Sequence, residues 1–116
     1  MALSDTAKHI IDTGVAALSE KKAEDITVID ISEISVIADA LVIATGNNKK
    51  QIQAMSDAAD EKLSKEGYTH YCIEGYDKAS WILIGYDDVI FHLFDHENRK
   101  FYDLERLYRD GTMISS

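Results

Sequence analysis

The chain has 116 residues, of which 46% are hydrophobic and 28% are charged, a length and balance that predict one folded domain and exclude intrinsic disorder. Its 21 acidic and 12 basic residues give a formal net charge of -9. A protein that grips nucleic acid through phosphates needs clustered basic side chains, so we expect no direct nucleic-acid specificity and, near RNA, a basic protein as the partner.

The chain is also expected to be cytoplasmic, with no contact with a membrane. Its longest apolar run, residues 36–44, is interrupted by Asp39 and is far shorter than the roughly 20 residues of a membrane span. The first ten residues, MALSDTAKHI, resemble neither a secretory signal nor a transit peptide. The single cysteine, Cys72, agrees with a reducing compartment.

The N-terminal part of the chain predicts one helix followed by two strands. Ser4 is a suitable helix cap, and apolar residues recur at helical spacing as far as Leu18. Residues 26–31, ITVIDI, and residues 40–46, ALVIATG, have the β-branched and apolar content of strands. The short link between them, residues 32–39, is a candidate for a helical turn.

A second helix is expected over residues 47–66, where Ile52, Met55, Ala59 and Leu63 fall on one face. Gly67 is suited to the left-handed position that ends such a helix. A third strand, residues 69–74, follows. A strand, a long helix and another strand form a crossover unit, so this strand should run parallel to residues 40–46 with a right-handed connection.

The C-terminal part predicts an antiparallel hairpin and a helical closing segment. Residues 81–86, WILIGY, and 88–94, DVIFHLF, are separated by a tight polar turn. Apolar residues of segment 96–108 fall at helical spacings, and Phe101, Leu104 and Leu107 are expected to pack while Tyr102, Glu105 and Arg106 are expected to be exposed. The polar tail, residues 110–116, is expected to fray. The prediction is an α/β fold, a single domain over residues 1–116 with a mixed, mostly five-stranded sheet flanked by helices.

Three groups of residues are candidates for sites of chemistry. The turn TGNNKKQ, residues 45–51, lies where a strand feeds a helix and could hold a phosphate, but it lacks the glycine pattern of nucleotide-binding loops, which favours a plain cap by Asn47 or Asn48. Acidic residues invite a two-metal site, although turn chemistry explains Asp87 and Asp88 equally well. The zinc candidates, which have no metal-ligand spacing, are His70, Cys72, His92 and His96.

Both faces of the hairpin are apolar, which leaves two interpretations open. Trp81 and Leu83 point to one side of their strand and Ile82 and Ile84 to the other, and the partner strand is equally apolar on its two sides. Either both faces are packed core, or one face is left for another molecule, since only two long helices are available to cover the sheet.

Three blocks of the sequence resemble the ribosomal silencing factor family, also called Iojap-like, in the same order along the chain. They are ALVIATGNNKKQIQAMSDAADEKL, EGYDKASWILIGYDDVIFHLF and RKFYDLERLY, and the likeness spans residues 5–110. The chain departs from the common pattern at Gly85 and Asp87, where many members have Asp and Gly, and at Tyr108, where many have Trp. These departures affect little beyond the hairpin tip.

The resemblance implies a nucleotidyltransferase-like topology without catalysis and without a cofactor or metal. It implies a translation repressor that binds the large ribosomal subunit through ribosomal protein L14, blocks joining of the small subunit and acts when nutrients are scarce. Homodimers also occur in the family, so the working form is either a monomer or a homodimer. The residues expected to bind the ribosomal protein are Trp81, Leu83, Tyr86, Asp88, His92, Phe94, Tyr102, Glu105 and Arg106.

The alternative function is a magnesium-dependent enzyme of nucleotidyltransferase type that uses Asp30, Asp87 or Asp88. Active members of that fold have a Gly-Ser turn and an alternating acidic pair on one strand, and this sequence has neither. Neighbouring residues of an extended strand point to opposite faces, so Asp87 and Asp88 would not converge on one metal ion. The sequence therefore favours a binding protein over an enzyme.

Overall fold

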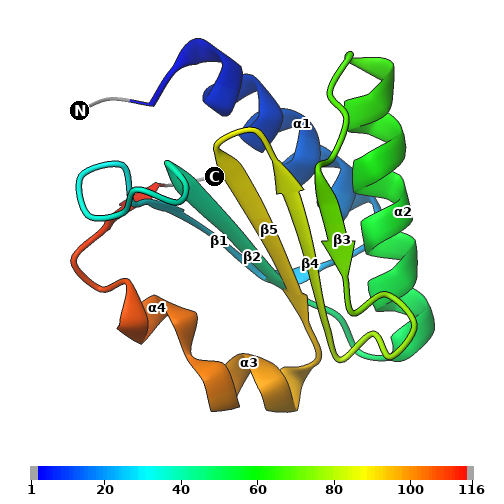
Figure 1. Ribbon diagram of the computed structural model, residues 1–116. Coiled ribbons are helices and arrows are strands. Elements are labelled where there is room, and N and C mark those ends of the chain that lie inside the picture. The colour runs from blue at the N-terminus through cyan, green and yellow to red at the C-terminus, as the bar shows by residue number, and fades with distance from the viewer. Residues whose placement is uncertain (1–2, 115–116) are drawn as a thin grey trace.

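Six strands form one mixed sheet in the computed structural model, which describes residues 3–114 (Figure 1). The strand order is β3-β4-β5-β2-β1-β6, and β2 pairs in parallel with β5 while the other neighbours are antiparallel. The elements in chain order are α1 (Asp5–Glu20), β1 (Glu24–Asp30), β2 (Ala40–Thr45), α2 (Lys49–Lys65), β3 (Cys72–Glu74), β4 (Trp81–Tyr86), β5 (Val89–Phe94), α3 (His96–Tyr102), α4 (Leu104–Leu107) and β6 (Thr112–Ile114).

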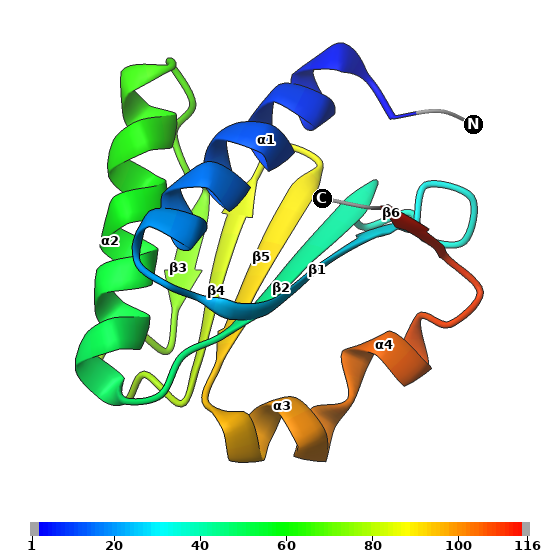
Figure 2. The same ribbon diagram turned by 180° about the vertical axis from the view of Figure 1, so that it is seen from behind.

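The two long helices lie together on one face of the sheet, behind it in Figure 1 and in front of it in Figure 2. Both begin at the caps that the sequence indicates. The Ser4 hydroxyl accepts from the Ala7 N–H, and the Asn48 side chain accepts from the Gln51 N–H. Gly67, which follows α2, adopts a φ of 92° as expected for a helix end.

The main core lies between these helices and the sheet. Its strand residues alternate with those of the opposite face, as the pleat requires. Gly14 allows α1 to lie close to the sheet, because a Cβ at this position would collide with the ring of Phe91. The fully buried residues include Ile10, Leu18, Val42, Ile52, Met55, Leu63, Ile82, Ile84, Phe91 and Leu93.

The hairpin is formed as the sequence predicts. Tyr86 pairs with Val89, so the connection is the two-residue turn Asp87-Asp88. Asp87 has a φ of 47°, a left-handed conformation that Asp tolerates better than most residues.

The parallel direction predicted for the crossover unit is confirmed, and its two strands are not neighbours in the sheet. β3 is antiparallel to β4, and β4 is antiparallel to β5, so β3 and β5 run in the same direction. Because β5 is parallel to β2, β3 also runs parallel to β2. However, β4 and β5 lie between β2 and β3. The reason is burial: the apolar β5 takes the central position, whereas the short, half-polar β3 is suited to an edge.

The tail supplies the sixth strand, so the predictions of five strands and of a frayed tail are wrong. Residues Thr112–Ile114 pair with β1, which would otherwise leave a row of unpaired backbone groups at the sheet edge. Residues 115–116 of the tail lie outside the described residues. The predicted strand over 69–74 is shortened to β3, and the link 32–39 contains a single turn closed by the Ser35 N–H and the Ile31 carbonyl.

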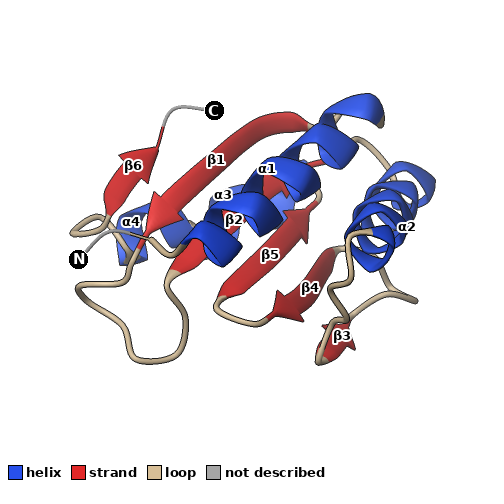
Figure 3. Cartoon of the chain, turned by 90° about the horizontal axis from the view of Figure 1, so that it is seen from above, coloured by secondary structure: helices blue, strands red, loops and turns tan. Residues whose placement is uncertain are grey.

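No helix among residues 3–114 is both long and apolar enough to cross a membrane. The view from above in Figure 3 shows α1 lying across β2 and β5, with α2 beside it. The short helices α3 and α4 follow β5 and lie along the lower end of the sheet in Figure 1. A smaller core beneath them contains Ile29, Ile31, Leu41, Ile43, Phe94 and Leu104.

Candidate functional site

The sheet face opposite the long helices is only partly covered. In Figure 1, which shows this face, no helix among the described residues lies over β3, β4 and β5. Strand pairing places Leu83 opposite His92 and Gly85 opposite Ile90, so these side chains share that face. We call the exposed and half-buried residues Tyr71, Trp81, Leu83 and Ile90 the open face.

Tyr71 forms the outer part of the open face. Its N–H donates to the Gly85 carbonyl at 2.9 Å, and its ring rests directly on Gly85, where any Cβ would collide with it. Its side chain is 59% exposed, a large value for an aromatic ring. Gly85 therefore serves to seat an aromatic residue flat on the sheet.

Trp81 joins the open face to α3 through a cluster of rings. Its indole N–H donates to His92 Nδ1 at 3.0 Å. Its ring centroid lies 4.4 Å from that of Tyr102 and 5.1 Å from that of Phe94. These distances are within the range of favourable aromatic pairs, so the indole is held in one position while part of it remains accessible.

His92 is buried beneath this cluster and is neutral at physiological pH. Burial lowers the pKa of His92 to about 4. Because Nδ1 accepts the hydrogen bond from Trp81, the proton of the neutral ring is assigned to Nε2. His92 therefore orients Trp81 from below and is itself 7% exposed.

An acidic rim borders the open face at the hairpin end. Asp39 and Asp88 directly precede the paired residues of β2 and β5, and the Asp39 N–H donates to the Asp88 carbonyl at 2.7 Å. Burial raises the pKa of the Asp88 carboxyl, and the charges of Asp87 and Asp39 raise it further. The three carboxylates therefore share one site and create a negative potential there.

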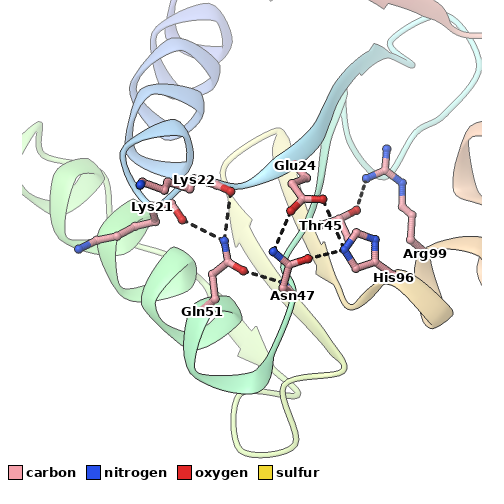
Figure 4. A network of polar contacts seen from close by, with 8 residues as sticks. All are labelled: Lys21, Lys22, Glu24, Thr45, Asn47, Gln51, His96 and Arg99. Atoms are coloured by element: carbon pink, nitrogen blue, oxygen red, sulfur yellow. Dashed lines mark hydrogen bonds and ion pairs between the residues drawn. The ribbon is translucent and has the colours of Figure 1, made fainter.

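Arg99 fastens the short helices to the sheet. Its guanidinium donates to Glu105 Oε2 at 2.7 and 3.1 Å, and to the hydroxyls of Thr45 and Thr27 at 2.8 and 3.1 Å; Figure 4 shows the bond to Thr45. Burial alone would raise the pKa of Glu105, but the hydrogen bond and charge of Arg99 outweigh it and hold that pKa below its usual range. One side chain thus links α3, α4, β1 and β2.

The structure separates the residues that the sequence nominated for partner binding. Trp81 and Leu83 belong to the open face, Asp88 lies on its acidic rim, and Tyr102 and Arg106 are exposed on the short helices. His92 and Phe94 lie on the same side but are buried under the ring cluster, and Glu105 is bound to Arg99.

Tyr86 is placed differently from the other nominated residues. It lies on the helix-covered face, is 1% exposed, and donates its hydroxyl to Asp60 Oδ1 at 2.5 Å. Burial and that carboxylate raise the pKa of Tyr86. Because successive side chains of a strand point to opposite faces, Tyr86 points away from the face that carries Trp81 and Leu83, and it is not part of the open face.

Two residues were assigned to packing from the sequence and are exposed instead. Phe101 and Leu107 are 77% and 70% exposed, whereas Leu104 alone of that set is buried. The left-handed Asp103, with a φ of 44°, breaks the helix between α3 and α4 and so changes the face on which each apolar residue falls. The short helical turns expected in this segment are present, whereas the packing expected of Phe101 and Leu107 was wrong.

The turn after β2 uses its polar groups internally (Figure 4). The Asn47 N–H donates to Gln51 Oε1 at 2.6 Å, and the Asn47 side chain contacts Glu24 at 2.8 Å and His96 at 2.7 Å. The Gln51 amide donates to two carbonyls of the turn after α1. This geometry supports the cap interpretation over the phosphate site, because these groups hold three segments of the chain together.

The metal and acid candidates are dispersed. Among residues 3–114, no group of three or more His, Cys, Asp or Glu side chains is arranged to hold a metal ion. Asp30 accepts from the backbone and hydroxyl of Ser32, a local turn contact. His70 contacts Asp60 at 2.8 Å, whereas His96 contacts Asn47, so the two histidines have separate partners.

Sequence reasoning missed Tyr71, Ile90 and Asp39 as parts of this surface. Gly85 was an available signal, since glycine inside a strand often marks a close approach by another group. Ile90 alternates with His92 and could have been assigned to the same face. Asp39 offered no such signal, because its position beside Asp88 depends on the pairing of β2 with β5.

Comparison with known proteins identifies the relatives of this chain. The family model "Ribosomal silencing factor during starvation" matches residues 4–116. The chain is 36% identical to ribosomal silencing factor RsfS of Bacillus subtilis over 91% of this chain and 90% of that protein. It is 30% identical to the mouse mitochondrial assembly of ribosomal large subunit protein 1, over 88% of this chain and 46% of that protein.

The fold is likewise similar to solved structures. A crystal structure of a Chromobacterium violaceum protein superimposes with a TM-score of 0.86 at 28% identity, over 93% of this chain and 89% of that one. The names of the relatives point to a ribosome-associated regulatory factor rather than an enzyme. On the strength of the match over nearly its whole length, the chain belongs to the ribosomal silencing factor family.

Proposed function

We propose that this protein binds the large ribosomal subunit through its open face and sterically blocks joining of the small subunit. The expected contact is the fourteenth large-subunit ribosomal protein, and the expected outcome is repression of translation in the cytoplasm when nutrients are limiting. The names of relatives that refer to ribosomal silencing and to large-subunit assembly support a large-subunit partner.

The observation that carries the proposal is the open face itself. An aromatic anchor held by neighbouring rings, with accessible Leu83, Ile90 and Tyr71 around it, has the composition of a protein interface hot spot. The acidic rim of Asp39, Asp87 and Asp88 complements a basic surface, as expected of a ribosomal protein. Charge complementarity mainly raises the rate of association and selects the partner.

The proposed mechanism contains no chemical step. Binding requires only that the open face be covered, so inhibition should need neither a nucleotide nor a divalent metal ion. A second copy of the chain could cover the same apolar residues, and a homodimer would then compete with the ribosomal partner. Dissociation of any dimer should accordingly accompany binding to the subunit.

Sedimentation with separated large subunits, small subunits and whole ribosomes tests the proposal. We expect the protein to sediment with large subunits and to be recovered least with preformed whole ribosomes, whose joining face is hidden. Equal recovery with all three particles, or with none, would contradict the proposal.

Titration during subunit reassociation tests the mode of action. Inhibition should increase until each large subunit carries one copy and should persist with a metal chelator present. Inhibition at strongly substoichiometric amounts, or its loss on chelation, would indicate catalysis. A magnesium-dependent turnover of nucleotide that is abolished in Asp88→Ala would then favour the enzymatic alternative.

A further inference from the structure

A second accessible surface lies on the short helices, beside the open face. A hollow of about 590 Å³ is lined by residues of α3, α4 and the segment after them: Lys100, Phe101, Tyr102, Asp103, Arg106, Leu107, Arg109 and Asp110. Phe101 and Leu107 are highly exposed there. Two exposed bulky apolar side chains on so short a segment indicate a surface that another molecule covers.

The charge of this hollow differs from that of the rest of the protein. All three arginines of the chain lie between residues 99 and 109. Arg99 is used to fasten the helices, whereas among the described residues no salt bridge is formed by Lys100, Arg106 or Arg109. Three cations and two carboxylates give the lining a formal charge of +1, against -9 for the whole chain.

The hollow and the open face are continuous. Tyr102 lines the hollow, and its ring is also paired with Trp81 at 4.4 Å. Phe101 lies edge-on to Tyr102, with ring centroids 5.0 Å apart. A single large partner seated on Trp81 would therefore also reach the hollow. The two surfaces have opposite electrostatic character, so such a partner must present a basic region and an anionic region side by side.

We propose that the hollow binds backbone phosphates of an RNA strand adjacent to the protein that covers the open face. Unpaired arginines are suited to bidentate phosphate contacts, and exposed aromatic rings are suited to stacking on unpaired bases. The net charge disfavours binding to RNA alone, so the protein contact must bring the phosphates within reach. This inference rests on the proposed function, since the large subunit offers protein and RNA on one surface.

The test compares two double variants that each remove two positive charges. Lys100→Gln with Arg109→Gln alters the hollow without touching a residue expected to bind the ribosomal protein, and Lys49→Gln with Lys50→Gln alters exposed positions at the start of α2 as a matched control. Affinity is measured for large subunits at several salt concentrations and for the isolated fourteenth ribosomal protein. Melting curves verify that both variants remain folded.

The hollow variant should bind large subunits about 10-fold more weakly and should bind the isolated protein as the wild type does. Each lost phosphate contact reduces the slope of log affinity against log salt by roughly 0.7 to 0.9, so loss of two contacts should reduce it by about 1.5. The control variant, Lys49→Gln with Lys50→Gln, should change the affinity for large subunits and the salt slope only as much as the loss of two distant positive charges requires.

The alternative outcomes are distinct. Unchanged subunit affinity and slope in the hollow variant would overturn the inference and leave the proposed function standing. An equal loss towards the isolated protein would show that the hollow contacts protein rather than RNA. Failure of the wild type to bind large subunits would overturn the proposed function, and the inference with it.

Discussion

Removal of the Trp81 side chain should affect stability and partner binding to separable extents. In Trp81→Ala the chain loses the ring contacts with Phe94 and Tyr102 and the hydrogen bond to His92. Replacing a fully buried tryptophan by alanine costs about 3 to 5 kcal/mol. Because Trp81 is only half-buried, we expect a loss of about 2 to 3 kcal/mol in the free energy of unfolding.

Two further variants divide this cost into its parts. Trp81→Phe keeps a ring in the cluster but removes the donor to His92, which should cost about 1 kcal/mol. Leu83→Ala removes a half-buried open-face side chain and leaves the ring cluster and the hydrogen bond to His92 in place, and it should cost about 1 kcal/mol. If the open face binds the partner, Leu83→Ala should nevertheless weaken binding about tenfold.

Urea denaturation followed by circular dichroism measures the stabilities, since tryptophan fluorescence is lost in two of the three variants. Sedimentation with large subunits, at a temperature at which every variant is folded, measures binding. If Trp81→Ala is no less stable than Leu83→Ala, the indole is free of the ring cluster and the predicted stabilities are wrong. If Leu83→Ala binds as well as the wild type, the open face is not the binding surface.

Three other predictions follow from single features of the structure. Arg99→Met should lower the free energy of unfolding by about 2 to 4 kcal/mol, because it leaves the partly buried Glu105 without its partner. Replacement of the exposed Arg106 by Met should change the free energy of unfolding by less than about 1 kcal/mol. Comparable urea midpoints for the two variants would contradict this prediction. His92 has a pKa of about 4 in the folded state, below its ordinary 6.5, so the unfolded chain takes up the proton first. The free energy of unfolding should therefore fall by about 3 kcal/mol as the pH drops from 6.5 to 4. His92→Asn should flatten this part of the pH profile of stability, and an unchanged profile would exclude His92 as its origin. Gly14→Ala should destabilise the protein by about 1 to 3 kcal/mol, because the added Cβ meets the core ring of Phe91. Gly85→Ala should mainly displace the exposed Tyr71 and weaken partner binding. Melting temperatures and binding to large subunits distinguish the two variants, and the reverse pattern would refute both assignments.

Local sequence patterns determined most of the helices and strands. The cap at Ser4, the spacing of Ile52 to Leu63 and the glycine after α2 correspond to contacts within a few residues, so both long helices were predictable. The hairpin was equally local, since a two-residue polar turn joins its strands. The family resemblance was also carried by the sequence alone, and the comparisons confirm it.

Strand order depended on contacts that the sequence does not encode locally. The parallel pairing of β2 with β5 places Asp39 beside Asp88 and moves β3 to the edge. The pairing of Thr112–Ile114 with β1 joins segments about 80 residues apart. Such pairings are selected by total burial and by satisfaction of backbone groups over the whole sheet, so a short polar tail can become a strand.

The candidate site shows the same division. Alternation along β4 placed Trp81 and Leu83 on one face, but it could not show which face the helices cover, and Tyr86, nominated for partner binding through the family resemblance, is buried on the covered face. Only the tertiary structure positioned Tyr71 on Gly85 and left Phe101 and Leu107 exposed. A side chain's exposure is set by what packs over it, which depends on distant segments of the chain and not on its neighbours in sequence.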